Sequence, residues 1–371
     1  MHNFLFSSEQ DLASFLKNKK FKKIFILCGK KSYVSSGAKK ILSICLKNKI
    51  IKHFFKYSPY PEISELKKII ISLREFSPDL IIAVGGGSVL DYAKMANAIE
   101  ITENLDKQIV NYSYPIKKKL TLLIAIPTTA GSGAEVTSNA VIYVDKIKYS
   151  VESNIIKPDY FFLIPKLVIN ASKKIKSSAG FDTIAQAVES LISKKSTPQS
   201  INFAKKSLGI SLKYYLDYLK KPNFENTSAM CLAANLSGKA ISISKTTAPH
   251  AVSYPFTSLF NISHGHAVSL TLEKFLKFNF IKSRKASCNF DLNLRFKSIF
   301  GIFGVKNINE LEFFIIEMKK KAKLESSFDK LKIKLNPNLD KILSGINVPR
   351  LKNNPIDLNI KDIKTILLKS N

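Results

Sequence analysis

One carboxylate and two imidazoles in the second half of the sequence have side chains that bind divalent metals. Asp182 lies in the segment FDTIAQAVES, His250 in TTAPHAVSYP and His264 in ISHGHAVSL. The chain has only five histidines, and three of them fall between positions 250 and 266. Any one of them alone reads as an ordinary histidine with a satisfied hydrogen bond, but together they predict a metal site. Gln186 follows Asp182 by four residues and therefore shares its helix face.

A glycine run in the first half has the composition of a phosphate-binding loop. It follows the apolar run LIIAV directly, precedes a helical pattern, and consists of Gly85, Gly86, Gly87 and Ser88. Glycines let the backbone approach a ligand closely, and a helix N-terminus offers free N–H groups to an anion. A tight strand-to-helix turn would explain a lone glycine run as well. Asp91 and Lys94 in the following helix favour the phosphate-binding interpretation.

A second candidate loop, PTTAGSGAEVT at 127–137, also follows a strand-like run. The hydroxyls of Thr128, Thr129 and Ser132 suit hydrogen bonds to a nucleotide, although a Ser/Thr-rich turn has the same composition. The GxGxxG motif of a simple Rossmann domain is absent after the first strand, where Gly29 and Lys30 stand instead. The simple Rossmann interpretation therefore fails.

The elements that would position these residues change in kind near position 170. Before it, strand-like runs at 23–27, 80–84 and 122–126 alternate with helical patterns at 36–46 and 89–99. This alternation predicts an α/β domain with a parallel sheet over 1–170. After it, we expect a helical domain over 171–371. Its helices are predicted at 181–192, 200–219, 227–244, 310–323 and 360–369, with turns at 335–338 and 353–355.

The composition fits a globular protein. The chain has 371 residues, of which 45% are hydrophobic, and this excludes wholesale disorder. No apolar run reaches the roughly 18 to 20 residues of a membrane helix, and residues 1–16 lack the pattern of a secretory signal. The four cysteines are scattered without a CxxC pair, so a reducing cytoplasm is the expected compartment.

The net charge of +30 comes almost entirely from lysine. A lysine-coated surface is the simplest interpretation, since charge concerns solubility and steering rather than fold. A nucleic-acid partner is the sharper alternative, but the lysines form no basic stripe interleaved with aromatic residues. Attraction of an anionic small substrate is a third interpretation and is compatible with the first.

The sequence resembles the iron-containing (group III) alcohol dehydrogenase family over nearly its whole length. The motifs GGGSVLDYAK, PTTAGSGAEVT, GFDTIAQAVES and PHAVSYPFTSLFNISHGHA occur in the family's order and spacing. The resemblance implies a Rossmann-like N-terminal domain and a helical C-terminal domain, the fold shared with glycerol dehydrogenases and dehydroquinate synthases. It also implies NAD(P)H in the cleft between them and, commonly, a dimer or larger assembly.

The resemblance also assigns roles to the candidate residues. The pyrophosphate would be bound by residues 85–88 with Asp91 and Lys94. The nicotinamide side would be lined by Thr128, Thr129 and Ser132. A divalent ion, Fe²⁺ or Zn²⁺, would be held by Asp182, position 186, His250 and His264.

The sequence departs from the family pattern at three places. Gln186 stands where the second metal ligand is usually His, and an amide oxygen is the weaker ligand. Tyr254 stands where a further His is often found. Gly29, followed by Lys30 and Lys31, replaces an Asp that selects NAD, which favours NADPH over NADH. We expect either Tyr254 or His266 to protonate the developing alkoxide.

The motif wording is similar to the branch of this family that reduces phosphonoacetaldehyde to 2-hydroxyethylphosphonate in phosphonate biosynthesis. Lys245, with Thr246 and Thr247, is the candidate contact for the phosphonate, although a solvated helix-end lysine fits the same pattern. Three alternatives stay open. They are a group III dehydrogenase for another aldehyde or semialdehyde, a dehydroquinate-synthase-like cyclase, and a basic nucleic-acid-binding protein.

Overall fold

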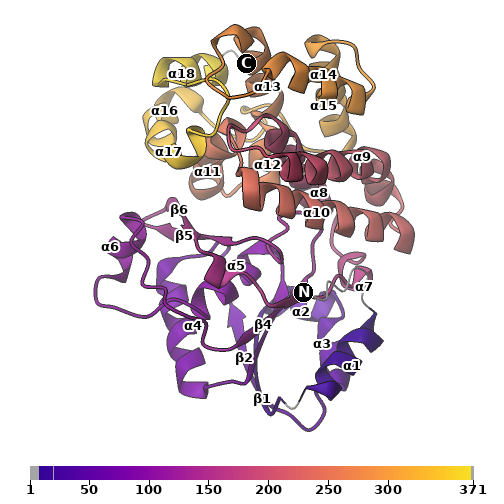
Figure 1. Ribbon diagram of the computed structural model, residues 1–371, viewed down its shortest axis with the longest axis vertical. Helices are drawn as coiled ribbons and strands as arrows, with labels where there is room; N and C mark the ends of the chain where they lie inside the picture. The colour runs from indigo at the N-terminus through magenta and orange to yellow at the C-terminus, as the bar shows by residue number, and fades with distance from the viewer. Residues whose placement is uncertain (1–7, 20, 369–371) are drawn as a thin grey trace. The chain divides into compact units, whose positions relative to one another are not determined.

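A computed structural model describes residues 8–19 and 21–368 and divides the chain into two compact units (Figure 1). The first unit comprises Met1–Ser172 with Pro222–Asn235, and the second comprises Lys173–Lys221 with Leu236–Asn371. The boundary expected at 170 lies close to this division, but the segment from Pro222 to Asn235 goes with the first unit. The Asn235 amide donates a hydrogen bond to Glu135 there, at 2.9 Å. The division therefore falls inside helix α10 (Phe224–Ser244).

Five parallel strands form the sheet of the first unit, in the order β2-β1-β3-β4-β7. The three predicted strands are confirmed, and each is buried on both faces, as central parallel strands must be. β2 (IIKHFFK) escaped prediction because it is a half-exposed edge strand with lysine and histidine inside its apolar run. The strands are β1 (Lys23–Gly29), β2 (Ile50–Lys56), β3 (Leu80–Gly85), β4 (Leu122–Pro127) and β7 (Tyr160–Phe161).

Helices cover both faces of this sheet, because successive strand side chains point to opposite sides. Phe25 and Leu27 pack on one side with α4 (Ile63–Phe76) and α5 (Gly87–Ala96). Alternate residues of the same strands pack with the helices of the other side, and Figure 1 shows α4 and α3 on opposite sides. The other helices of this unit are α1 (Glu9–Asn18), α2 (Lys30–Ser35), α3 (Ala38–Cys45), α6 (Leu105–Val110) and α7 (Pro165–Val168).

Two local features of the first unit differ from the prediction. The helix expected at 36–46 is found as α3, and a short helix that was not predicted, α2, precedes it; Gly37, with a left-handed φ of 88°, separates the two. A β-hairpin, β5 (Asn139–Val144) with β6 (Ile147–Glu152), was not predicted. Its two turn residues, Asp145 and Lys146, both have positive φ, as a two-residue type I′ turn requires.

The second unit is helical, and its described residues contain no strand. The five predicted helices are confirmed, although the first begins at Lys173 rather than at 181 and the one expected at 310–323 ends at Lys321. Lys369 lies outside the described residues. The turn predicted at 335–338 is wrong, because Pro337 sits in the first turn of a helix, where backbone N–H groups have no intrahelical partner. The turn at 353–355 is confirmed. Within the described ranges no helix is long and apolar enough to cross a membrane.

The second unit contains the C-terminal part of α10 and ten further α-helices among the described residues. They are α8 (Lys173–Ile192), α9 (Pro198–Lys220), α11 (Ala248–Phe260), α12 (His264–Ser269), α13 (Leu272–Ile281), α14 (Leu292–Phe303), α15 (Ile308–Lys321), α16 (Leu335–Ser344), α17 (Val348–Leu351) and α18 (Ile360–Leu368). The predicted fold class, an α/β unit followed by a helical unit, is confirmed.

Candidate functional site

The strand register brings the predicted nucleotide loops to one edge of the sheet. β1, β3 and β4 are neighbours and run in parallel, with Cys28 opposite Val84 and Gly85 opposite Pro127. The loops after all three strands therefore lie at the same carboxyl edge. From β1 the strand order runs to β2 on one side and to β3 on the other. A reversal of this kind marks the place where open α/β sheets bind their ligands.

The two loops that follow β3 and β4 approach each other so closely that a side chain at Gly87 would collide with Ser132. A Cβ at Gly87 would lie 2.6 Å from Ser132 Oγ, and one at Gly86 would lie 3.4 Å from Thr129 Oγ1. The Thr128 N–H donates to the Gly85 carbonyl at 2.9 Å. Helix α5 begins at Gly87, so its unpaired N–H groups face the region where both loops meet. This arrangement has the features of a pyrophosphate site.

Asp91 and Lys94 are buried and connect α5 to the end of the second loop and to strand β5. Lys94 Nζ donates to Thr137 Oγ1 at 2.7 Å and to the Asn139 carbonyl. Asp91 Oδ2 accepts the Val141 N–H at 3.1 Å. Burial raises the pKa of Asp91, and the neighbouring Lys94 opposes that rise. These contacts support the loop from behind, and direct contact of either residue with a cofactor stays a prediction.

The end of β1 lacks an acidic side chain and carries cations instead. Gly29 is the N-cap of α2, and Lys30 is its first residue. Lys30 and Lys31 are both exposed. The position thus offers positive charge, and no carboxylate, to a phosphate group beside the first strand.

Three side chains from three helices converge in the second unit. Asp182 on α8, His250 on α11 and His264 on α12 offer ligand atoms that all lie within 4.8 Å of one another. Asp182 Oδ1 is 3.1 Å from His250 Nε2 and 3.9 Å from His264 Nε2. One carboxylate and two imidazoles are a donor set that fits Fe²⁺ or Zn²⁺. The sequence-predicted cluster is thus brought together in space.

The close approach of α12 to α8 depends on a glycine beside His264. A Cβ at Gly265 would lie 1.9 Å from the Ser178 carbonyl oxygen and 2.9 Å from Asp182 Cβ. No side chain fits that distance, so glycine is required for α12 to present His264 to the carboxylate of Asp182.

Glu189 holds His250 in place, and sequence reasoning missed it. Glu189 is fully buried, and its Oε2 contacts His250 Nδ1. Its Oε1 accepts the N–H and the hydroxyl of Thr247, each at 2.9 Å. The second ring nitrogen of His250 is thereby left to face Asp182. Burial lowers the pKa of His250, but the charges and hydrogen bonds of Glu189 and Asp182 together raise it to about 9.

Spacing could have revealed Glu189. It follows Asp182 by seven residues, or two helical turns, and so lies on the same face of α8.

Gln186 also lies beside the cluster, and its amide is occupied. Its Nε2 donates to Asp182 Oδ2 at 3.0 Å, and its Oε1 accepts the Ser237 hydroxyl at 2.9 Å. The side chain is buried. Both ends of the amide are therefore engaged by protein groups, and ligation of a metal by Gln186 stays a prediction.

The two candidate proton donors lie in different surroundings. Tyr254 is buried with its ring centroid 5.7 Å from that of His264, and burial raises its pKa to about 12. Tyr254 therefore keeps its proton at neutral pH. His266 Nε2 instead donates to the Glu325 carbonyl at 2.7 Å, and burial lowers the pKa of His266. The geometry favours Tyr254 as the proton donor near the cluster.

A buried polar surface lies next to Tyr254. Thr246 is buried and hydrogen-bonds the Tyr254 hydroxyl, while its carbonyl accepts the Asn353 amide at 3.2 Å. The positive charge of the buried Arg350 partly opposes the rise in the pKa of Tyr254 that burial causes. Lys245 is half-buried, with a left-handed φ of 61° just after α10. Arg350 was not predicted, because nothing in its spacing links it to the motifs.

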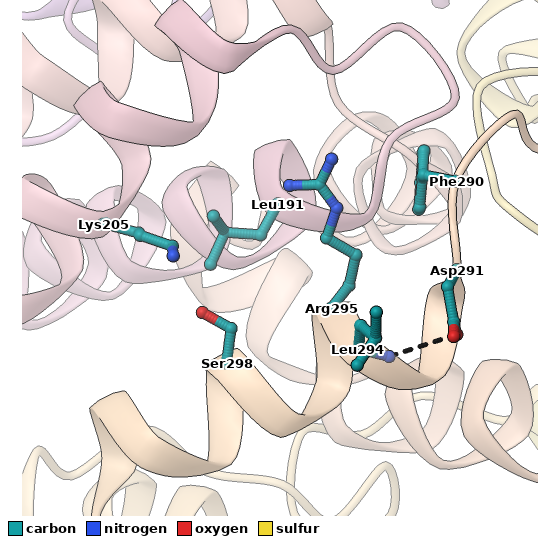
Figure 2. Close-up of a pocket in the computed structure, with 7 residues that line it drawn as sticks. All are labelled: Leu191, Lys205, Phe290, Asp291, Leu294, Arg295 and Ser298. Carbon is teal, nitrogen blue, oxygen red and sulfur yellow. Dashed lines mark hydrogen bonds between the residues drawn. The ribbon is translucent and has the colours of Figure 1, made fainter.

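A cavity elsewhere in the second unit contains none of the predicted site residues (Figure 2). Leu191 lines it from α8, nine residues after Asp182 and so on the opposite side of that helix. Two of its charged groups have structural partners, since Asp291 caps α14 and the Arg295 guanidinium lies 4.7 Å from the Phe290 ring centroid. The lining residues are Leu191, Lys205, Phe290, Asp291, Leu294, Arg295 and Ser298.

The fold and the two sites define a class of protein, an oxidoreductase with a nucleotide-binding α/β unit and a metal-binding helical unit. Residues 4–165 match the family model described as iron-containing alcohol dehydrogenase. Residues 176–371 match the model of the C-terminal part of the Fe-containing alcohol dehydrogenase family. The chain therefore belongs to the iron-containing alcohol dehydrogenase family. The predictions of this family, of an NAD(P)-dependent enzyme and of a divalent metal are confirmed at that level.

Several proteins of known name are similar to this chain. Phosphonoacetaldehyde reductase of Streptomyces viridochromogenes is 30% identical over 217 residues, which is 56% of this chain and 55% of that protein. The alignment thus spans little more than half the length of that reductase. 1-Propanol dehydrogenase PduQ of Citrobacter freundii is 30% identical over 275 residues, 73% of this chain and 71% of that protein.

Among solved structures, sulfoacetaldehyde reductase from Bifidobacterium kashiwanohense in complex with NAD⁺ has a TM-score of 0.85 and 26% identity. The match covers 98% of this chain and 95% of that one.

Proposed function

We propose that this protein reduces a small anionic aldehyde to its primary alcohol with NAD(P)H, and that the aldehyde is phosphonoacetaldehyde. The product is then 2-hydroxyethylphosphonate. One observation carries this proposal: the cluster of Asp182, His250 and His264 adjoins a buried surface with the cations and hydroxyls that a dianion needs. Arg350 and Thr246 belong to that surface, and Lys245 directly precedes Thr246 in the chain. The relatives named for phosphonoacetaldehyde and sulfoacetaldehyde support an anionic substrate.

We assign separate roles in the reaction to the residues of the second unit. A divalent metal held by Asp182, His250 and His264 supplies Lewis-acid polarisation of a carbonyl oxygen. Glu189 fixes the ring of His250 through Nδ1. Tyr254 holds a proton on its hydroxyl at neutral pH and is the group we assign to protonate the alkoxide oxygen after hydride transfer. His266 supports the fold through its bond to the Glu325 carbonyl.

The first unit sets the choice of nucleotide. Lys30 and Lys31 offer positive charge beside Gly29, so we propose NADPH as the preferred donor over NADH. The glycine loop at 85–88 would bind the pyrophosphate, and the second loop would line the nicotinamide with Thr128, Thr129 and Ser132. We further propose that the enzyme works as a homodimer in the cytoplasm, within phosphonate biosynthesis. The four free cysteines are consistent with a reducing compartment.

The test is NADPH oxidation followed by absorbance, with the metal-loaded protein and a panel of aldehydes. Phosphonoacetaldehyde runs beside sulfoacetaldehyde, succinic semialdehyde, acetaldehyde and propanal, each with and without a chelator, and each with NADH as the alternative donor. We expect the highest kcat/KM for phosphonoacetaldehyde and loss of turnover with the chelator. A higher kcat/KM for propanal would favour the activity in the name of the PduQ relative and overturn the anionic substrate. Equal kcat/KM with NADH would overturn the nucleotide preference.

A further inference from the structure

We propose that Gln186 positions Asp182 instead of ligating the metal, so that the protein supplies three metal ligands rather than four. The inference rests on the proposed function in one respect, namely that a divalent metal binds at Asp182, His250 and His264. It starts from the buried chain of hydrogen bonds that runs from Ser237 through Gln186 to Asp182. Both ends of the Gln186 amide are engaged in this chain.

The chemistry of the two partners fixes which way the amide points. An ionised carboxylate only accepts hydrogen bonds, so the group of Gln186 that faces Asp182 Oδ2 at 3.0 Å must be the NH₂. An NH₂ group carries no lone pair for a metal. The oxygen of the same amide is turned the other way and accepts the Ser237 hydroxyl at 2.9 Å. The Gln186 oxygen, its only donor atom toward a metal, is thus directed to α10.

The consequence for Asp182 is a carboxylate with two distinct oxygens. Oδ2 is held by the Gln186 amide. Oδ1 faces the Nε2 atoms of both His250 and His264, at 3.1 and 3.9 Å. Gln186 therefore selects the oxygen that Asp182 presents to the cluster, just as Glu189 selects the nitrogen that His250 presents. Three protein ligands leave coordination positions open, which is the pattern of catalytic rather than structural metal sites.

The test uses Co²⁺ as the probe metal, because its visible absorption reports the number and type of its ligands. Metal-free wild type is titrated with Co²⁺, and the same titration is made with Gln186→Leu, Ser237→Ala and Ser244→Ala. The last is the matched control: Ser244 is a buried serine of the same helix, and its hydroxyl bonds Ser190 rather than Gln186. Thermal unfolding of each metal-free variant reports whether it is folded.

For Gln186→Leu we expect Co²⁺ binding to weaken about 10- to 100-fold, as for other groups that orient a ligand. The absorption bands per bound ion should keep their wavelengths and intensities, since no ligand is lost. Ser237→Ala should weaken binding about threefold, because one hydrogen bond that orients the amide is gone. Ser244→Ala should leave binding unchanged.

Two results would overturn the inference. The first is a changed Co²⁺ spectrum in Gln186→Leu, which would show that a ligand has been removed. The second is tighter binding in Ser237→Ala, which would show that Ser237 competes with a metal for the amide oxygen. A wild type that binds no Co²⁺ overturns it as well. None of these readouts needs an aldehyde, so a failure of the substrate proposal alone leaves the role of Gln186 standing.

Discussion

The imidazole of His250 lies between two carboxylates, Glu189 at Nδ1 and Asp182 at Nε2, that have different structural roles. The fully buried Glu189 hydrogen-bonds one ring nitrogen and accepts the backbone N–H of Thr247. Asp182 faces the other ring nitrogen. A histidine held in this way meets a metal in one orientation and with one tautomer. The buried carboxylate of Glu189 is stabilised in return by Thr247 and His250. At this scale the site is a set of hydrogen bonds that each fix one donor atom.

Substitution of Lys245 by glycine tests whether its ammonium group contacts the anionic substrate. Its left-handed backbone, φ 61°, strains any residue with a Cβ. Lys245→Gly removes the ammonium group and that strain together. We expect unfolding stability in urea to rise by about 1 kcal/mol. Because the cation is lost, KM for phosphonoacetaldehyde should rise about tenfold, while KM for acetaldehyde should not change.

Lys245→Ala supplies the control, since it removes the cation and keeps the strain. It should show the same rise in KM as Lys245→Gly without the gain in stability. Equal KM values for phosphonoacetaldehyde in wild type and both variants would show that Lys245 does not meet the substrate.

Residue types and spacing predicted the convergence of Asp182, His250 and His264, because each sits in a distinctive motif. They did not predict Arg350, which enters the site region only because α17 packs on α11. That packing is visible in the Asn347 N–H bonded to the Ala251 carbonyl at 3.3 Å. Contacts made by tertiary packing between segments a hundred residues apart leave no local signal in a single sequence.

At the scale of elements, the approach of α12 to α8 is the contact most sensitive to a single atom. Gly265→Ala would place a methyl group 1.9 Å from the Ser178 carbonyl oxygen, a backbone atom that cannot move without bending α8. We expect a loss of about 3 kcal/mol in stability, as for severe overpacking of a core. Co²⁺ affinity should fall at the same time, because His264 moves with α12. Urea unfolding and Co²⁺ titration measure the two effects.

Gly209→Ala on α9 is the matched control. Nothing lies within 4 Å of a Cβ at that position, so alanine should stabilise the helix by about 1 kcal/mol through propensity alone. A Gly265→Ala variant as stable as wild type would contradict the close packing of α12 on α8.

Helix α13 carries a lysine whose environment makes stability depend on pH. Burial lowers the pKa of Lys274 to about 8, with the adjacent Glu273 opposing. Its ammonium lies 5.2 Å from the Phe328 ring centroid. Between pH 8 and about 10.5 the unfolded chain holds a proton that the folded protein has lost, so this group makes stability rise with pH in that window. At neutral pH the charged, partly buried ammonium of Lys274 destabilises the fold.

Lys274→Met should therefore stabilise the protein by about 1 kcal/mol at pH 7, a value discounted for the partial exposure of the side chain. The gain should shrink toward zero as pH rises through 8 to 10.5. Urea unfolding at pH 7, 8.5 and 10 measures it, and Lys282→Met, an exposed lysine at the end of the same helix, is the control. A gain that is constant with pH would show that titration of Lys274 is not its cause.

The central strands and the long helices were predictable because their burial imposes a clear period on the sequence. The strands at 24–27, 80–84 and 122–126 are continuous apolar runs, because both faces of each strand are covered. β2 and the β5–β6 hairpin were not predictable in the same way. β2 is an edge strand with polar residues, and the hairpin turn is Asp145-Lys146, without the glycine that usually marks a type I′ turn.

For the whole molecule, the net charge of +30 is compatible with the anionic substrate that we propose. A field of this sign raises the local concentration of a dianion and speeds its encounter with the protein. Such steering acts over distances comparable to the Debye length, about 30 Å at 0.01 M salt and 8 Å at 0.15 M. It is a property of the summed surface charge, so no single lysine can account for it.

Ionic strength therefore provides a test that separates the field from the local contacts. We expect kcat/KM for phosphonoacetaldehyde to fall about tenfold between 0.01 and 0.2 M NaCl, and kcat/KM for acetaldehyde to stay nearly constant, both at saturating NADPH. Lys245→Gly should start from a lower kcat/KM for the phosphonate but show nearly the same fractional fall with salt, because it removes one charge of thirty. Parallel salt dependence for the two aldehydes would assign the positive surface to solubility alone and leave substrate selection to the buried residues around Tyr254.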